Sequence, residues 1–272
     1  MSERKTLLVW YIVLAPFVTL LLLGFGSLEV LWILFFSHMT LLATTLIPSL
    51  QGFGPVVRFF EPEGNQIWLT IDDGPNSTTT PAILELLDRF DAKATFFLIG
   101  EKAVAAPHLV KMILQRGHSI GNHTQNHPQL RFWGLGPRRL RKEIDDFERT
   151  MRDRDLPIPS LFRAPTGMKN PFLHPILAAR RLLLVGWSAR AYDTRIKQAA
   201  TVAERLLRTA KPGSILLLHE HSPVSVQTLE ILLCGLADQR IDCVIPSSGC
   251  LRIGRMDPKA KCLDCEPTWG TF

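Results

Sequence analysis

Two adjacent carboxylates are the residues with the clearest chemical potential. In the stretch TIDDGP, Asp72 and Asp73 come directly after an apolar run and directly before a Gly-Pro turn. A plain turn needs at most one Asp. Two neighbouring like charges are expected either in a solvated loop or in a site where a cation offsets their repulsion. The pair is therefore a candidate metal and acid–base site.

Two histidines could supply the nitrogen ligands of such a site. His123 and His127, in the stretch HTQNH, are four residues apart, so on a helical turn they would share one face. With one carboxylate they form a ligand set with open positions, which suits Zn²⁺ and also Co²⁺, Mn²⁺ or Ni²⁺. The spacing alone would also fit a solvated or capping pair, but the nearby aspartates favour a metal.

Two further residues could complete a hydrolytic site. The carboxylate that does not bind the metal could take a proton from a water molecule whose pKa the metal lowers. Arg163 could pair with that carboxylate and fix its orientation, and His219 could protonate the leaving group. Taken singly, Arg163 would fit a surface ion pair and His219 a satisfied histidine at a strand end. Together they suit hydrolysis of an unstrained amide, which needs a nucleophile, an oxyanion stabiliser and an acid for the amine.

The elements that must position these residues alternate between strand and helix from residue 66 onward. Short apolar runs such as QIWLTI and ATFFLI are separated by helical segments, which predicts a parallel α/β sheet, open or closed into a barrel. Each candidate follows the end of a predicted strand. These positions are Asp72, Asp73, His123, His127, Arg163, Asp193 and His219. Because the carboxyl ends of parallel barrel strands share one face, we expect one site there.

The first fifty residues form a separate apolar region. Residues 6–23 and residues 30–50 are each long enough to span about 30 Å of hydrocarbon as a helix. The short connection GFGSLE predicts a transmembrane helical hairpin, and Arg4, Lys5 and Arg58 then indicate that both ends lie on the cytoplasmic side. The alternative is that only the first run spans, which would place the rest of the chain outside. The hairpin, which we favour, predicts a protein integral to the cell (inner) membrane with its catalytic domain facing the cytoplasm.

The remaining segments are a linker and a tail. We expect an anchor at residues 1–50, a linker at 51–65, a catalytic domain at 66–250 and a Cys-containing tail at 251–272. A single CxxC pair, Cys262 and Cys265, is a weak zinc signal and favours free thiols or a loop disulfide. The net charge of +6 comes without a run of basic residues interleaved with aromatics, so no nucleic acid is expected. It suits anionic lipid or phosphorylated ligands instead, and no obligatory protein partner is evident.

Five motifs in order resemble those of the polysaccharide deacetylase family, the NodB-homology domain of carbohydrate esterase family 4. The resemblance covers about residues 66–250. TIDDGP is similar to the family's TFDDGP, ATFFLIG to the strand that follows, and GHSIGNHTQNH to its H-[ST]-x-x-H motif. RAPTG is similar to Arg-x-Pro-aromatic-Gly, and ILLLHE to Leu-x-His. The resemblance implies a distorted (β/α) barrel of the NodB-homology type with seven or eight strands.

The resemblance also implies a role for each motif residue. Asp72 would be the general base, Arg163 would orient it, and His219 would be the general acid. The metal, expected to be Zn²⁺, would be bound by Asp73, His123 and His127, and the backbone N–H of Thr166 would be the oxyanion donor.

Two positions depart from the family pattern. Thr166 stands at the aromatic position of the third motif, which removes one wall of a sugar subsite but keeps the backbone donor. In WSARAYDT, Arg190 stands at the first Asp of the family's D-x-x-D-W, with Asp193 at the second and Thr194 at the Trp. That first Asp supports the catalytic His, and Arg190 cannot do so because a cation depresses the pKa of a histidine. Asp193 could substitute for it.

The sequence therefore predicts a membrane-anchored, metal-dependent hydrolase. It would remove an N-acyl group, expected to be acetyl, from an amino sugar in a polysaccharide or a lipid-linked saccharide. An O-deacetylase or a deformylase would use the same machinery. A saccharide-binding protein that keeps the metal pocket but has little turnover is the alternative that Arg190 leaves open. A purely structural membrane protein would not explain five intact polar motifs.

Overall fold

The computed structural model describes residues 14, 16–23, 31–51 and 53–253. In the apolar N-terminal region, residues 16–23 are helical and α2 spans Leu31–Leu46. None of the helices formed by these described residues is both long enough and apolar enough to cross a membrane. The helices of the predicted hairpin are thus not found there: half of the first run lies outside the described residues. The second run forms only the 16-residue α2, because Pro48 cannot continue a helix.

A curled parallel sheet forms the centre of the fold. The strands, in spatial order, are β6 (Leu183–Leu184), β5 (Leu161–Phe162), β4 (Ser119–Asn122), β3 (Ala94–Leu98), β2 (Gln66–Gly74), β8 (Ile215–His219) and β7 (Ala189–Arg190). The strand β9 (Asp242–Cys243) also pairs with β2. In the described part of the chain β6 and β7 end this order without pairing with each other, so the expected distorted barrel of seven or eight strands is a half-barrel, an eight-stranded sheet that stays open on one side.

A short antiparallel pair lies across the gap between the two ends of the sheet. The strand β1 (Val57–Phe60) pairs with β10 (Leu251–Ile253). Val57 bridges to Val185, just after β6, and Phe59 bridges to Ser214, just before β8. Residues that we assigned to a linker and to a tail therefore contribute strands to the fold.

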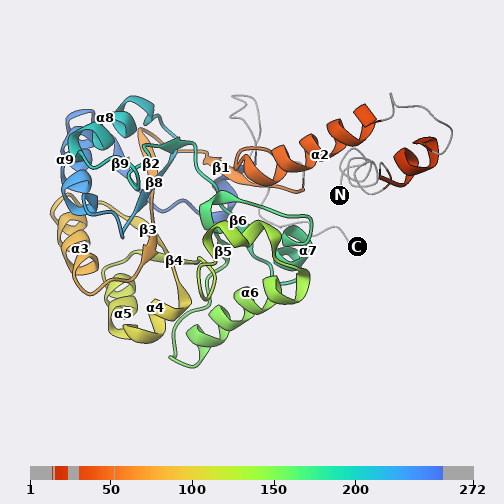
Figure 1. Ribbon diagram of the computed structural model, residues 1–272. Coiled ribbons are helices and arrows are strands. Elements are labelled where there is room, and N and C mark those ends of the chain that lie inside the picture. Colours follow the sequence, from red (N-terminus) through yellow and green to blue (C-terminus); the bar gives the residue numbers. More distant parts are fainter. Residues whose placement is uncertain (1–13, 15, 24–30, 52, 254–272) are drawn as a thin grey trace.

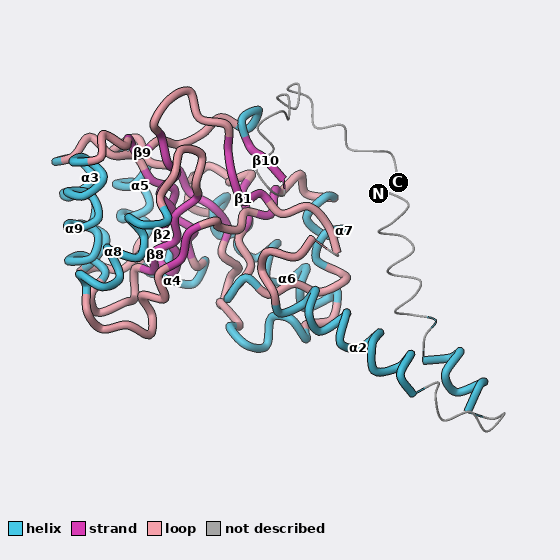
Figure 2. Tube along the Cα trace, turned by 90° about the horizontal axis from the view of Figure 1, so that it is seen from above, coloured by secondary structure: helices cyan, strands magenta, loops and turns pink. Residues whose placement is uncertain are grey.

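Helices surround the sheet (Figure 1). They are α3 (Thr79–Arg89), α4 (Gly100–Ala105), α5 (Pro107–Gln115), α6 (Pro137–Arg152), α7 (Leu173–Ala178), α8 (Ala199–Thr209) and α9 (Ser225–Asp238), with short 3₁₀ turns η2 (Gln129–Gly134), η3 (Pro165–Gly167) and η4 (Ser248–Cys250). Apolar residues of α3, α5, α8 and α9 share one core with the central strands. The helices α6 and α7 share a second core with β5 and β6. Figure 2 shows α2 extending away from the body of the molecule on the side of α6 and α7.

The strand β2 shows why the core and the site lie on opposite faces of one sheet. Successive side chains of a strand point to alternate faces. Ile67, Leu69 and Ile71 join the core under the helices. Trp68 packs in the interior of the half-barrel, and Asp72 follows it on the same face. Both faces of the strand are buried, as expected for a parallel sheet covered by helices.

The end of α2 is attached to the body of the molecule by a buried lysine. Lys169 is 1% exposed, and its Nζ donates hydrogen bonds to the carbonyls of Ile47, Pro48 and Leu50 at 2.9, 2.9 and 2.7 Å. Its backbone N–H also donates to the carbonyl of Thr45. Lys169 follows η3 by two residues, so the same segment carries the RAPTG motif and the contact with α2.

Candidate metal and catalytic site

The two aspartates of TIDDGP reach one site because the backbone changes direction between them. Consecutive strand residues would point to opposite faces. Asp73, however, has φ of 73°, in the left-handed region, and the pairing of β2 with β3 shifts register between Asp72 and Gly74. Both carboxylates are buried, and both lie beside His123: Asp72 Oδ2 is 3.7 Å and Asp73 Oδ1 is 3.4 Å from its Nε2. The double Asp is thus a bulged strand end that directs two carboxylates into one place.

The two histidines meet in a loop rather than on a helix. Residues 123–127 are not helical, so the helical turn that we predicted is wrong. Thr124 and His127 have left-handed φ values of 70° and 49°, and this fold of the loop brings the rings of His123 and His127 within 4.7 Å of each other. The two histidines are therefore brought together by an irregular turn and not by a helix. The Thr124 hydroxyl stabilises this turn by accepting a hydrogen bond from the His127 N–H.

Asp73, His123 and His127 form a group that fits a divalent metal ion. Their donor atoms lie within 4.8 Å of one another. Asp73 Oδ1 is buried without a hydrogen-bond partner among the described residues, which is what a ligand oxygen requires. Because the Arg163 carbonyl can only accept, His123 Nδ1 donates to it at 2.8 Å, and Nε2 is left as the ligand atom. An Asp/His/His set suits Zn²⁺ and other first-row ions, so the residues fit the expected cofactor.

The charges of the three ligands are tuned by burial and by each other. Burial alone would raise the pKa of Asp73, but the adjacent imidazoles of His123 and His221 outweigh it and hold the pKa well below its usual range. Burial, and then the charge of His123, lowers the pKa of His127 to about 4. Burial alone would also lower the pKa of His123, yet Asp72 and Asp73 outweigh it and raise that pKa. The two carboxylates thus favour positive charge at the place where His123 meets Asp73.

Arg163 holds Asp72 from beneath the site. Its guanidinium is fully buried and donates to Asp72 Oδ1 at 2.7 Å and to the Thr70 hydroxyl at 2.8 Å. It also donates to the carbonyls of Val185 and Gly186, and it lies 4.1 Å over the ring of Phe97. The alternative of a surface ion pair is therefore wrong. A buried cation with several partners fixes both the charge and the orientation of Asp72.

His219 is held by Asp193, the residue that could substitute for the missing family Asp. Its Nδ1 donates to Asp193 Oδ1 at 2.9 Å, and its backbone N–H donates to Oδ2 at 2.6 Å. This leaves Nε2 as the free ring nitrogen. Arg190 instead stacks on the rings of Trp187 and Tyr192, and its buried Nε has no hydrogen-bond partner within the described residues. His219 thus has a carboxylate partner in Asp193, at a different position from the Asp of the family pattern that Arg190 replaces here.

The alkaline side of the pH profile is expected to depend on Asp193. Burial alone would lower the pKa of His219, but the hydrogen bond and charge of Asp193 outweigh it and raise the pKa. A general acid works when protonated, so activity is present below the raised pKa and is lost above it. Asp193→Asn should therefore move the alkaline limb of kcat/KM to lower pH, measured from neutral to alkaline pH. An unchanged limb in this variant would show that His219 is not the acid.

Thr166 is exposed and lies in the turn η3, three residues after Arg163. Its φ is 56°, and its side-chain hydroxyl donates to the Pro165 carbonyl. The following Gly167 has φ of 73°, and a Cβ there would come within 2.4 Å of the Trp187 ring and 2.8 Å of Pro48. The turn is thus packed closely against both residues. The role of the Thr166 N–H as an oxyanion donor stays a prediction.

A cavity of ≈ 550 Å³ opens beside the metal group. Its lining consists of Asp73, Ile99, Glu101, Lys102, Ala105, Asn126, His127, Gln129 and His221. Two of the lining residues that were not assigned from the sequence contact Asp73: Lys102 Nζ donates to the Asp73 carbonyl at 2.7 Å, and His221 Nδ1 lies 2.7 Å from Asp73 Oδ2. Only the closeness of His221 to His219 in the sequence could have indicated it, and no motif marks Lys102.

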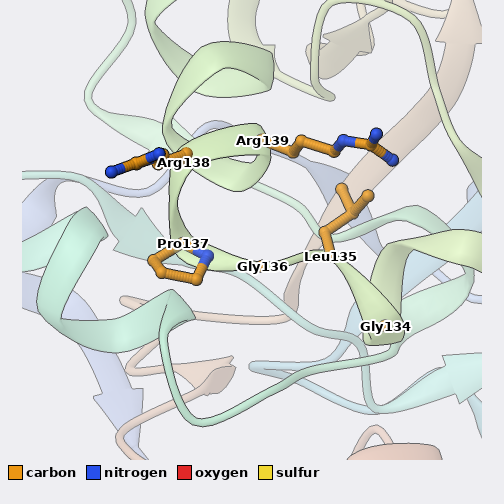
Figure 3. A pocket seen from close by; sticks show the side chains of 6 residues that line it. All are labelled: Gly134, Leu135, Gly136, Pro137, Arg138 and Arg139. Atoms are coloured by element: carbon orange, nitrogen blue, oxygen red, sulfur yellow. The ribbon is translucent and has the colours of Figure 1, made fainter.

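A second hollow lies where α6 begins, and it is separate from this site. It is lined by residues 134–139 (Figure 3). The side chains of Arg138 and Arg139 extend in opposite directions, so the two guanidinium groups do not converge on one ligand. None of the candidate residues lines it.

Comparison with known proteins identifies the family. Residues 61–181 match the family described as Polysaccharide deacetylase. The chain is 34% identical over 188 residues to a peptidoglycan-N-acetylglucosamine deacetylase of Bacillus cereus, covering 63% of this chain and 85% of that protein. It is 32% identical to the peptidoglycan-N-acetylglucosamine deacetylase PgdA of Listeria monocytogenes over 64% of this chain, which corresponds to only 36% of that longer protein.

A solved structure agrees with this assignment. The crystal structure of the Bc1960 peptidoglycan N-acetylglucosamine deacetylase superimposes with a TM-score of 0.64 at 30% sequence identity. The match covers 69% of this chain and 88% of that one. The chain belongs to the polysaccharide deacetylase family. Its Asp/His/His group consists of the three residues that the sequence resemblance implied as metal ligands.

Proposed function

We propose that the chain is a metal-dependent hydrolase that removes an acetyl group from the amine of an N-acetylated amino sugar. The observation that carries the proposal is the joint geometry of the two aspartates. Asp73 belongs to the metal group, while Asp72 stands beside it and is bound to Arg163 instead. One carboxylate is thereby a ligand and the other a base, which is the division that amide hydrolysis needs. The names of the relatives support an N-acetylglucosamine unit in the substrate.

Each residue then has one task. Asp72 accepts a proton from the attacking water, and Arg163 keeps Asp72 ionised and oriented. The Thr166 N–H donates to the oxyanion. His219 gives a proton to the departing amine from Nε2, while Asp193 holds its Nδ1. When bound, a divalent cation polarises the acyl carbonyl and lowers the pKa of a water molecule at the site.

The geometry favours turnover over simple saccharide binding. The loss of a carboxylate at Arg190 is the feature that would favour a protein with little turnover. Asp193 makes both a side-chain and a backbone contact with His219, so the general acid keeps its support. Deformylation and O-deacetylation would use the same residues, and a substrate panel separates them.

The apolar N-terminal region supports attachment to a membrane and a lipid-linked substrate. The helix α2 has no acidic residue in its first turn and no basic residue in its last, and Trp32 and Phe36 are 63% and 57% exposed. Such a surface is typical of contact with lipid. A catalytic body fixed to this helix would act on a saccharide carried by a lipid, on the cytoplasmic side if the predicted hairpin forms.

Removal of the metal should abolish activity reversibly. The full chain in detergent is treated with a chelator and supplied with N-acetyl and N-formyl amino sugars, free and lipid-linked, while acid release is measured. We expect release of acetate only before chelation and after Zn²⁺ is added back, because Asp72 alone cannot make a strong nucleophile of water at neutral pH. Release that persists in the metal-free chain would contradict the proposal. Release of formate alone would show that the acyl group removed is formyl and not acetyl.

A further inference from the structure

The turn after β8 holds one histidine that has no place in the proposed reaction. His221 lies between Glu220 and Ser222, which are 1% and 2% exposed. The Glu220 N–H donates to the Asp72 carbonyl, and the Ser222 hydroxyl donates to the Asp193 carbonyl at 2.9 Å. The residues on either side of His221 are therefore hydrogen-bonded to the segments that carry Asp72 and Asp193. The His221 side chain is itself 48% exposed and lines the cavity beside the metal group.

The two oxygens of Asp73 have different partners. Oδ1 lies 3.4 Å from His123 Nε2 and 3.2 Å from His127 Nε2. Oδ2 lies 2.7 Å from His221 Nδ1, which is a hydrogen-bond distance. A carboxylate held at one oxygen in this way cannot rotate without breaking that hydrogen bond. The other oxygen is thereby directed at the two histidines.

We infer that His221 is a positioning residue for the metal ligand Asp73. Its Nδ1–H donates to Oδ2, so that Oδ1 is presented to the cation together with His123 and His127. The inference rests on the proposed function, because it concerns the same metal site. His221 is not one of the three residues that form the metal group, so we assign it to orienting Asp73 and not to binding the cation. Partners that orient a ligand in this way typically change metal affinity by about 10–100-fold.

Zinc affinity without substrate tests this role. Binding of Zn²⁺ to the full chain in detergent is measured by competition with a chromophoric chelator. His221→Ala should weaken binding about 10–100-fold, because Asp73 loses the donor that orients it. His221→Asn should recover most of the affinity, since the Asn amide places a donor near the position of Nδ1. The matched control is His108→Ala, a change at an exposed histidine on α5 outside the site, which should leave affinity unchanged.

Activity at saturating Zn²⁺ separates positioning from substrate contact. If His221 only positions Asp73, excess Zn²⁺ should return most of the kcat of His221→Ala, and KM for the sugar should stay near that of the wild type. Unchanged zinc affinity with a raised KM would overturn the inference and make His221 a substrate contact, while the proposed function would stand. A wild-type chain that binds no divalent metal would overturn both. Rescue of zinc affinity by His221→Asn, but not by His221→Leu, would support the role of the hydrogen bond.

Discussion

Asp72→Asn should lower acetate release by about 10²–10⁴-fold, the usual contribution of a general base. Asn cannot accept the proton, but its side-chain oxygen can still accept the hydrogen bond that Arg163 donates to Asp72. Metal binding should persist, because Asp72 is not one of the three ligands. Acetate release and metal content are measured on the same preparations.

Two control variants make the result specific. Asp73→Asn should lose both metal and activity, since it removes a ligand charge. Asp153→Asn, an exposed carboxylate at the end of α6, should change neither. If Asp72→Asn keeps most of the activity, the base is another group. If the wild-type chain releases no acid from any sugar while it binds metal, the saccharide-binding alternative is favoured.

Arg163→Met should lower the free energy of unfolding by about 3–5 kcal/mol, the range found when one partner of a buried ion pair is removed. The substitution leaves the buried Asp72 carboxylate without its cation and leaves the carbonyls of Val185 and Gly186 without their donor. Equilibrium unfolding in urea, followed by circular dichroism of the full chain in detergent, measures the change.

The size of this effect should depend on burial and on the charge of Asp72. Arg89→Met removes an ion pair whose side chains are 59% and 48% exposed, so the expected loss is about 0–1 kcal/mol. Arg163→Met combined with Asp72→Asn should be less unstable than Arg163→Met alone, because no uncompensated carboxylate remains buried. Equal losses from Arg163→Met and Arg89→Met would show that the buried pair does not contribute as the structure indicates.

The sequence was sufficient to predict which residues meet, because their positions follow strand ends. Asp72, His123, Arg163 and His219 each follow or end a short apolar run, and the curled parallel sheet gathers those ends. The conformation of the metal loop could not be predicted in the same way. It depends on left-handed residues at Asp73 and Thr124, and neither residue type requires that conformation.

Long-range contacts were the other part that the sequence did not show. The strands β1 and β10 are separated by almost the whole described body of the chain, and a four-residue run such as VRFF carries no sign of its partner. The residues around it have Gly, Pro and charge, which favoured a linker. The contact between His221 and Asp73 is likewise a product of the fold, since no local spacing relates the two residues.

The lysine that binds the segment after α2 changes where the apolar N-terminal region ends and the folded body begins. Three carbonyls of residues 47–50 complete the hydrogen bonding of a buried ammonium that lies two residues beyond the turn with Thr166. The segment from Thr45 to Leu50 is therefore packed together with the RAPTG turn, and a chain that starts at residue 51 would lack all three carbonyl partners of that ammonium. Pro48 also packs closely on Gly167, so the segment after α2 lies against the loop of the proposed oxyanion donor. The apolar region therefore meets the turn with Thr166 through direct contacts of Lys169 and Pro48, and not only through the chain that connects them.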